Sequence, residues 1–503
     1  MSARAASLLA AILCLGLAGQ ADAEAVELRP VDCWMEGNVF QSVDCYRVIL
    51  PLDRTNPGAG TVDLPVAVLR ASTGTPLPDP VMYLEGGPGA PTFESGYPDF
   101  ERFDDLWWSH STPFRRQRDF ILFEQRGIGM ALPSLDCPEL HDLDAATAHW
   151  PGYDDPVFDE EITALAACHD RLVAEGVDLA AFDTRASADD VADIVHALGY
   201  ERVNLYGVSY GTRLGLEVMR RHPEMVRAAV LDGVYPPDVD AELDFPAAIA
   251  GAFANLFEDC DADPGCRRIA PDARAHLEAM VEELNAEPRE LELYDHDYFG
   301  RGQMVRFDGS FVLSSMIDML YDAHWLTYIP LVVATADRGE RDALSYFYWS
   351  TTFAAQGMAE GAFINIECRE APTLDTALLD ARARDYGVYG QAALDWSLVP
   401  YCAAWPVARD PLDTGGPVVS DIPTLLMSGR YDPVTPARFA EHAAETLEHS
   451  AQLVFLSGGH AVTFWFDCAR DAAAAFIENP DPQAVAAPRC RDFSKPADFA
   501  RRF

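Results

Sequence analysis

Residues 207–211, which read Gly-Val-Ser-Tyr-Gly, decide the fold because their flanks supply the two elements that a G-x-S-x-G turn requires. Residues 203–206 are mostly β-branched or aromatic and predict a short strand. Residues 212–221 have helical spacing, and Pro223 ends the pattern. A sharp strand-to-helix turn through small residues lifts the serine hydroxyl out of the sheet. We therefore predict that Ser209 is a nucleophile, against the alternative of an ordinary βα turn.

A nucleophilic serine needs a base and an acid, which follow it along the chain in this arrangement. Residues 424–429 read as a buried strand, and Asp432 lies in the turn after it. Residues 452–456 read as a second strand, and a Gly-Gly loop leads from it to His460. Both side chains thus leave the C-terminal ends of parallel strands, where ligands bind in open α/β sheets. We predict a catalytic triad of Ser209, His460 and Asp432.

Asp232 is the alternative acid, because it also ends a predicted strand. The Gly-Arg-Tyr-Asp-Pro turn around Asp432 fits the usual position of the acid better, so Asp432 is favoured. Among the 12 histidines, only His460 follows a strand through a Gly-Gly loop. Four others fall in helical patterns and are predicted to be surface or packing residues: His196, His222, His442 and His449.

The oxyanion hole requires backbone N–H donors close to the nucleophile. One is expected from Tyr210, the residue after Ser209. Further donors are expected from Gly86 and Gly87, in the loop that follows a predicted strand at residues 81–84. Glycines let the backbone approach a substrate oxygen closely, although the loop also fits a plain Gly-Pro turn.

Together these segments resemble the prolyl iminopeptidase and tripeptidyl aminopeptidase family of α/β-hydrolases. The resemblance covers most of residues 46–236 and 416–470. It rests on Gly86-Gly87-Pro88-Gly89, on residues 119–129, 207–212 and 230–234, and on the turns at Asp432 and Gly459-His460. The family usually has His or Asn-Pro where this chain has Glu85, and Asp-x-Arg-Gly where this chain has Glu124-Gln125-Arg126-Gly127.

The resemblance implies an α/β-hydrolase fold with a mostly parallel central sheet and an inserted helical cap. It also implies a peptidase that releases residues from free peptide N-termini, needing no cofactor. The late cysteines and the C-terminal extension look more like the tripeptidyl branch than the compact prolyl iminopeptidases. A carboxylesterase or lipase-like enzyme with the same triad, and a non-catalytic binding module on this fold, are the alternatives.

The length of 503 residues is long for a bare hydrolase core, so an insertion is expected. The core pattern breaks after Pro236-Pro237 and resumes near Pro417, with helical patterns between them at residues 245–257, 272–284, 311–321 and 328–336. Aromatic residues at 346–349 and Phe353 either line the substrate pocket or form the core of the cap. The predicted division is a signal peptide at 1–23, a hydrolase core at 24–236 and 416–503, and a helical cap at 237–415.

The N-terminus has the form of an export signal. Arg4 supplies positive charge, residues 5–17 are apolar, and Ala-Asp-Ala at 21–23 resembles a cleavage site. The apolar run is shorter than the roughly 20 residues that span a bilayer. We therefore expect a periplasmic or secreted protein without a membrane anchor.

The cysteines agree with export. Of 11 cysteines, Cys14 lies in the leader, which leaves an even ten for disulfides in an oxidising compartment. None has the spacing of a zinc site, so no metal is predicted. Local spacing suggests the pairs Cys33–Cys45, Cys137–Cys168, Cys260–Cys266, Cys368–Cys402 and Cys468–Cys490.

The net charge of −43 argues against nucleic acid and anionic membranes as partners. Peptides with free N-termini are the expected substrates, and an exopeptidase must bind their ammonium group. Carboxylates in a partly dry pocket do this well, because charge-assisted hydrogen bonds are strong. Glu367 and Glu370 are the candidates, Glu85 is the reserve, and a solvated surface role is the alternative. The sequence makes no prediction of the oligomeric state.

Overall fold

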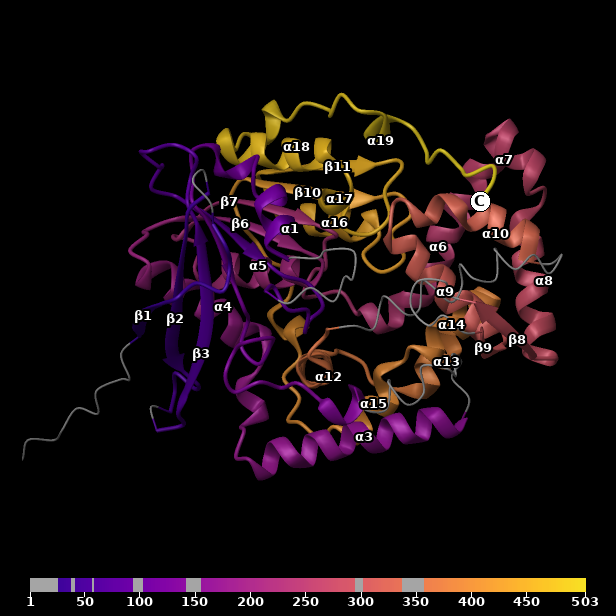
Figure 1. The fold of residues 1–503 in the computed structure, drawn as a ribbon, viewed down its shortest axis with the longest axis horizontal. Coiled ribbons are helices and arrows are strands. Elements are labelled where there is room, and N and C mark those ends of the chain that lie inside the picture. The colour runs from indigo at the N-terminus through magenta and orange to yellow at the C-terminus, as the bar shows by residue number, and fades with distance from the viewer. Residues whose placement is uncertain are drawn as a thin grey trace, which may run out of the picture.

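The computed structural model describes residues 26–37, 41–56, 58–93, 103–141, 155–294, 302–336 and 357–503. Within them lie a sheet of nine strands, in the order β1-β2-β3-β5-β4-β6-β7-β10-β11, and a separate pair, β8-β9 (Figure 1). The strands are β1 (Glu27–Val31), β2 (Val43–Pro51), β3 (Thr61–Leu69), β4 (Val81–Leu84), β5 (Phe120–Phe123), β6 (Val203–Val208), β7 (Val226–Asp232), β8 (Arg289–Tyr294), β9 (Gly302–Phe307), β10 (Thr424–Gly429) and β11 (Ser450–Phe455).

The large sheet is antiparallel from β1 to β5 and parallel from β5 through β4, β6, β7 and β10 to β11. This confirms the predicted α/β fold. Neighbouring residues of a strand face opposite sides, and Leu205 and Tyr206 accordingly join different apolar clusters. One cluster includes α4 (Thr184–Ala197), α5 (Tyr210–Arg221) and α16 (Ala437–Ala444). The other includes α1 (Phe103–His110) and α18 (Asp467–Glu478).

The insertion between β7 and β10 is largely helical, as predicted. Its described helices are α6 (Ala241–Ala262), α7 (Pro264–Ile269), α8 (Ala273–Ala286), α9 (Gly309–Tyr321), α10 (Ile329–Ala336), α12 (Glu360–Glu370), α13 (Thr376–Ala383), α14 (Gly387–Asp395) and α15 (Leu398–Ala404). The β8-β9 hairpin was not predicted, although Arg-Glu-Leu-Glu-Leu-Tyr at 289–294 alternates with a period of two. The aromatic run at 346–349 and Phe353 lie outside the described residues, as does the predicted signal peptide.

The helices of the insertion pack in two separate groups. Helices α6 to α10 and α14 share an apolar cluster of their own. Helices α12 and α15 instead contribute to the main cluster of the hydrolase core and pack against α3 (Asp155–Ala174). In Figure 1, α3 runs beneath α12 and α15, although it precedes β6 in the sequence. Packing therefore does not follow the division of the chain at residues 236 and 416.

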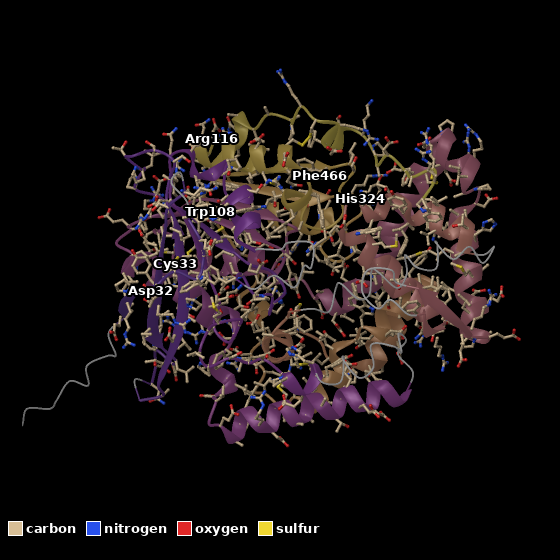
Figure 2. All side chains as sticks on the ribbon, in the orientation of Figure 1. Asp32, Cys33, Trp108, Arg116, His324 and Phe466 are labelled. Atoms are coloured by element: carbon tan, nitrogen blue, oxygen red, sulfur yellow. A yellow bond between two sulfur atoms is a disulfide. The ribbon has the colours of Figure 1, made fainter. Side chains whose placement is uncertain are left out.

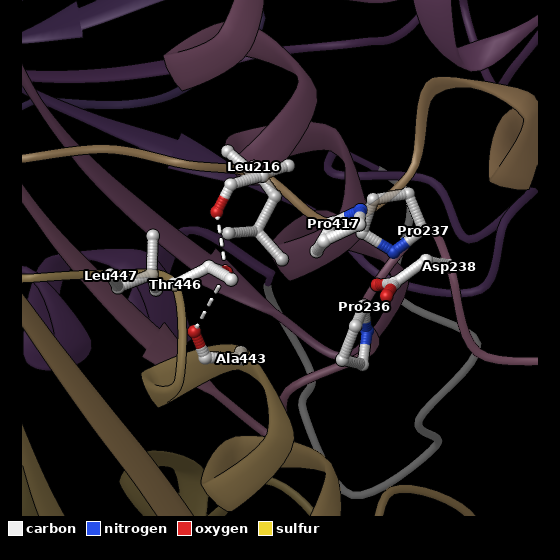
Figure 3. A pocket seen from close by; sticks show the side chains of 9 residues that line it. Leu216, Pro236, Pro237, Asp238, Pro417, Ala443, Thr446 and Leu447 are labelled. Carbon is white, nitrogen blue, oxygen red and sulfur yellow. Dashed lines mark hydrogen bonds between the residues drawn. The ribbon is translucent and has the colours of Figure 1, made fainter.

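The entry and exit of the insertion lie side by side. Pro236, Pro237 and Pro417 line one small pocket together with Leu216 of α5 and Thr446 (Figure 3). The Thr446 hydroxyl donates to the carbonyl oxygens of Val418, at 2.8 Å, and Ala443, at 3.4 Å. We propose that this pocket marks the boundary of the cap, because both connecting segments meet there.

The C-terminal segment, residues 495–503, connects the hydrolase core to the insertion by packing against it. After α19 (Arg491–Ser494) the chain crosses to the α6–α10 group, where it ends (Figure 1). Ala497 and Phe499 are buried in the apolar cluster of that group. The Ala500 N–H donates to the Thr327 carbonyl oxygen at 3.0 Å. This segment therefore packs on the group that contains α9, and the carbonyl oxygen of Tyr321, the last residue of α9, accepts the His460 N–H at 3.2 Å.

The five predicted disulfides are confirmed: Cys33–Cys45, Cys137–Cys168, Cys260–Cys266, Cys368–Cys402 and Cys468–Cys490. Cys33 lies beside the edge strands of the sheet (Figure 2). The Cys468–Cys490 bond joins the start of α18 to the residue immediately before α19. Among the described helices, none is both long and apolar enough to cross a membrane.

We predict that the protein without residues 1–23 contains no free thiol when it is purified from an oxidising compartment. Thiol titration of denatured protein should count none before reduction and ten after it. Each bond should contribute about 2–4 kcal/mol to the free energy of unfolding. Two or more reactive thiols before reduction would contradict the pairing.

Candidate active site

Ser209 lies at the turn between β6 and α5 in a strained conformation. Its φ is 56° and its ψ −126°, a region that non-glycine residues rarely adopt. The turn is tight, because a methyl group at Gly207 would lie 2.4 Å from the Gly211 carbonyl oxygen. A methyl group at Gly211 would lie 2.0 Å from the Leu84 carbonyl oxygen. The two glycines of the motif are therefore required by backbone contact, and the predicted elbow is present.

His460 and Asp432 form a buried pair at the ends of the two late strands. The Nδ1 atom of His460 lies 2.8 Å from Oδ2 of Asp432. The other Asp432 oxygen accepts the N–H groups of Val434, at 2.9 Å, and Thr435, at 2.7 Å. The Thr435 hydroxyl donates to Oδ2 at 2.7 Å. With exposures of 6% and 2%, His460 and Asp432 are largely shielded from water.

The two groups of the pair stabilise each other's charge. Burial disfavours the imidazolium of His460, but the adjacent Asp432 carboxylate outweighs it and raises the pKa of the ring above its ordinary value. Burial likewise disfavours the Asp432 carboxylate, but His460 and the hydrogen bonds from Thr435 hold its pKa below the usual value. This arrangement suits a base that must accept and return a proton.

Asp232, the alternative acid, does not bond to the imidazole. Its carboxylate accepts the N–H groups of Val462 and Thr463 and the Thr463 hydroxyl. Its backbone oxygen accepts the N–H of Ser209 at 2.8 Å. A methyl group at the next residue, Gly233, would lie 3.1 Å from Cε1 of His460. Ser209 and His460 therefore flank the same turn at the end of β7.

The predicted oxyanion loop lies against the serine, but one of its donors is engaged. A methyl group at Gly86 would lie 3.0 Å from Cβ of Ser209. The Gly86 N–H donates to Oε1 of Glu85 at 2.8 Å, and the Tyr83 hydroxyl donates to the same atom at 3.0 Å. Burial raises the pKa of Glu85 to about 7, although both hydrogen bonds oppose this. An oxyanion would thus compete with the Glu85 carboxylate for the Gly86 N–H.

Sequence reasoning missed the residues that hold this loop. The Gln125 side-chain amide donates to the Glu85 carbonyl oxygen at 3.0 Å. The Glu124 carboxylate accepts the N–H groups of Thr92, at 2.9 Å, and Phe93, at 3.0 Å. Both glutamate and glutamine belong to the segment that departs from the family pattern. The sequence analysis therefore quoted both residues as part of the family resemblance, but it assigned no function to either of them.

Glu370 reaches from the insertion to the elbow. Its carboxylate accepts the Thr184 N–H at 2.6 Å and the Thr184 hydroxyl at 2.8 Å. That hydroxyl is also 2.7 Å from the Tyr210 hydroxyl, next to Ser209. Burial raises the pKa of Glu370 to about 8, against the opposing charge of Arg213 and the bonds from Thr184.

Glu367 lies one turn of α12 earlier, and its carboxylate accepts no hydrogen bond from the described residues. It is 7% exposed, and burial raises the pKa of its carboxyl while the charge of Arg213 opposes this. Burial and the charges of Glu370 and Glu367 raise the pKa of Tyr210, so both carboxylates act at the elbow. Sequence reasoning missed a third carboxylate, Glu242 of α6. Burial raises its pKa to about 7, and Glu367 adds to the effect.

Three groups of side chains have metal-ligating atoms within 4.8 Å of one another among the described residues. Two of them contain disulfide-bonded cysteines, which cannot serve as thiolate ligands. The third consists of Asp136, His141 and Glu360, at the start of α12. There, Nε2 of His141 lies 3.4 Å from a carboxylate oxygen of Asp136 and 3.3 Å from one of Glu360.

Residues 79–467 match the family model described as alpha/beta hydrolase fold. The chain belongs to this family. It is 27% identical over 464 residues to the serine protease Hip1 of Mycobacterium tuberculosis, covering 86% of this chain and 84% of the relative. It is 26% identical over 271 residues to the tripeptidyl aminopeptidase of Streptomyces lividans, covering 51% and 48%.

A further relative is the carboxylesterase B of Mycobacterium tuberculosis, which is 26% identical over 457 residues, covering 83% of this chain and 80% of the relative. Among solved structures, the proline iminopeptidase of Mycobacterium smegmatis aligns with 87% of this chain and 99% of its own length. The sequence identity is 15% and the TM-score 0.40.

We predict that kcat/KM rises with pH through a pKa above 6.5, the ordinary value for histidine, because His460 must be neutral to accept a proton. Asp432→Asn should lower the pKa of the His460 ring, as measured by NMR titration of its protons. Asp238→Asn is the matched control, since Asp238 pairs with His442 at 2.8 Å outside the site. A ring pKa that is unchanged or higher in Asp432→Asn would contradict the electrostatic account.

Proposed function

We propose that the protein is an exported serine aminopeptidase. The observation that carries the proposal is the buried His460–Asp432 pair beside the strained Ser209 elbow. Similarity to a serine protease and a tripeptidyl aminopeptidase supports a peptidase, and five disulfides agree with an oxidising compartment outside the cytoplasm.

The proposed reaction proceeds through an acyl-enzyme. Ser209 attacks the scissile carbonyl while His460 takes the serine proton and then gives it to the leaving amine. Asp432 orients the imidazole and stabilises its charged form. Water activated by His460 then releases the acyl group. The N–H groups of Tyr210 and Gly87, with Gly86 once Glu85 yields its hydrogen bond, are the proposed donors to the oxyanion.

An aminopeptidase also needs a negative group for the substrate ammonium, and Glu367 fits this role best. Glu370 is occupied by Thr184, and Glu85 is occupied by Tyr83 and Gly86. The Glu367 carboxylate accepts no hydrogen bond from the described residues, so its hydrogen-bonding capacity is not used within them. Arg213 is the positive charge that favours its ionised form. An ammonium bound there would be held by a charge-assisted hydrogen bond.

We predict that Ser209→Ala abolishes turnover without unfolding the protein. Loss of a triad serine typically costs on the order of a million-fold in kcat. Asp432→Asn should reduce kcat by about 10,000-fold and Asp232→Asn by less, because only Asp432 bonds to the imidazole. Assays of tripeptidyl, prolyl and aminoacyl amides beside a simple ester would measure this. Full turnover by folded Ser209→Ala would remove the proposal, and the reverse order of the aspartates would reassign the acid.

We also predict that Glu367→Gln lowers kcat/KM for free-amine peptides about tenfold or more and barely affects a neutral ester, because only the peptide uses the anchor. Glu224→Gln, on the exposed surface, controls for the loss of one charge. Equal losses on both substrates would indicate damage to the fold. Equal rates on blocked and free N-termini in the parent enzyme would favour a carboxylesterase.

A further inference from the structure

We propose that Asp232 is a positioning residue for His460: its buried carboxylate fixes the turn that carries the imidazole, and a chain of hydroxyl groups fixes the carboxylate. The inference rests on the proposed triad but concerns groups outside it.

The turn after His460 is strained and needs external support. Ala461 has a φ of 59°, in the left-handed region that disfavours residues other than glycine. Such a conformation persists only where the surroundings enforce it. The next two residues begin the short helix α17 (Val462–Trp465), whose first N–H groups have no partner within the helix. The Asp232 carboxylate supplies that partner.

Both carboxylate oxygens of Asp232 accept hydrogen bonds from the first residues of this helix. The Val462 N–H donates to Oδ1 at 3.2 Å, and the Thr463 N–H donates to Oδ2 at 2.7 Å. The Thr463 hydroxyl donates to Oδ2 at 2.6 Å. Asp232 is fully buried, so these bonds are not exchanged with water. They fix the backbone within three residues of the imidazole.

A chain of hydroxyl groups extends from the carboxylate along the face of the sheet that packs against α1 and α18. The Tyr206 hydroxyl donates to the Thr463 hydroxyl at 2.7 Å, and Nε2 of His110 lies 2.8 Å from the Tyr206 hydroxyl. Burial, with a contribution from Arg470, lowers the pKa of His110 to about 3, so its ring is neutral. A neutral ring that carries its proton on Nε2 donates to Tyr206, and every hydroxyl in the hydrogen-bonded chain then both donates and accepts. The hydrogen-bonded chain thus ends on the Asp232 carboxylate.

The same geometry explains why Asp232 is not the acid of the triad. Three donors from the His460 turn occupy its carboxylate, while Asp432 takes the ring nitrogen. Asp232 therefore positions His460 through the backbone, and its charge also contributes to the raised pKa of the imidazole. Loss of these hydrogen bonds should displace the imidazole. The displacement should lower the rate of the chemical step without changing substrate affinity.

The test removes the hydroxyl of Thr463 while leaving its N–H in place. Thr463→Val should lower kcat about tenfold with KM unchanged, and equally for a free-amine peptide and a neutral ester. Thr463→Ser, which restores the hydroxyl, should recover kcat to within about twofold of the parent. Tyr206→Phe should give a smaller loss of the same kind, because it removes only the next link. Asp232→Asn should give a larger loss than either.

The matched control is Tyr200→Phe, which deletes a hydroxyl that donates to Asp119 at 2.8 Å outside the site. It should leave both kinetic constants unchanged. A folded Thr463→Val protein with the parent kcat would overturn the inference, as would a loss confined to KM or a loss that Thr463→Ser does not repair. Turnover by Ser209→Ala would instead refute the triad, so the two failures are distinguishable.

Discussion

The close approach of backbone segments around Ser209 is the constraint on which the rest of the site depends. The start of α5 is pressed against the end of β4, where only a glycine at position 211 avoids the Leu84 carbonyl oxygen. This contact forces the chain into the strained conformation of Ser209. It also brings the serine between the Gly86 loop and the Asp232–Gly233 turn. The geometry of Ser209, the proposed nucleophile, is therefore set by packing of main chain on main chain.

Buried carboxylates surround this elbow, and each is stabilised differently. Asp432 is held by an imidazole, and Asp232 by donors from the helix start that it supports. Glu370 is held by Thr184. Glu367 has only the nearby charge of Arg213. Burial raises the pKa of Glu367 and no described residue donates a hydrogen bond to its carboxylate, which is why we propose it as the group that binds the substrate ammonium.

Local patterns in the sequence predicted most of the core. The strands before Ser209, Asp432 and His460 are short buried runs that end in turn residues, and the disulfides join cysteines close in sequence. The β8-β9 pair was not predicted, because its two short strands lie between segments with helical periodicity and were included in the predicted helical cap. The bond between Glu370 and Thr184 joins residues 186 apart, and no local pattern signals such a contact. The turn around Asp432 favoured this residue over Asp232 in the sequence, whereas the contact between Asp432 and His460, 28 residues apart, is visible only in the structure.

Active-site labelling with a fluorophosphonate probe tests the central claim most directly, because the probe bonds only to an activated serine. The native protein should take up one probe per chain, and peptide mapping by mass spectrometry should find the adduct on Ser209. Heat-denatured protein and the Ser209→Ala variant should remain unlabelled. Labelling on another serine, or none in correctly folded protein, would contradict the account.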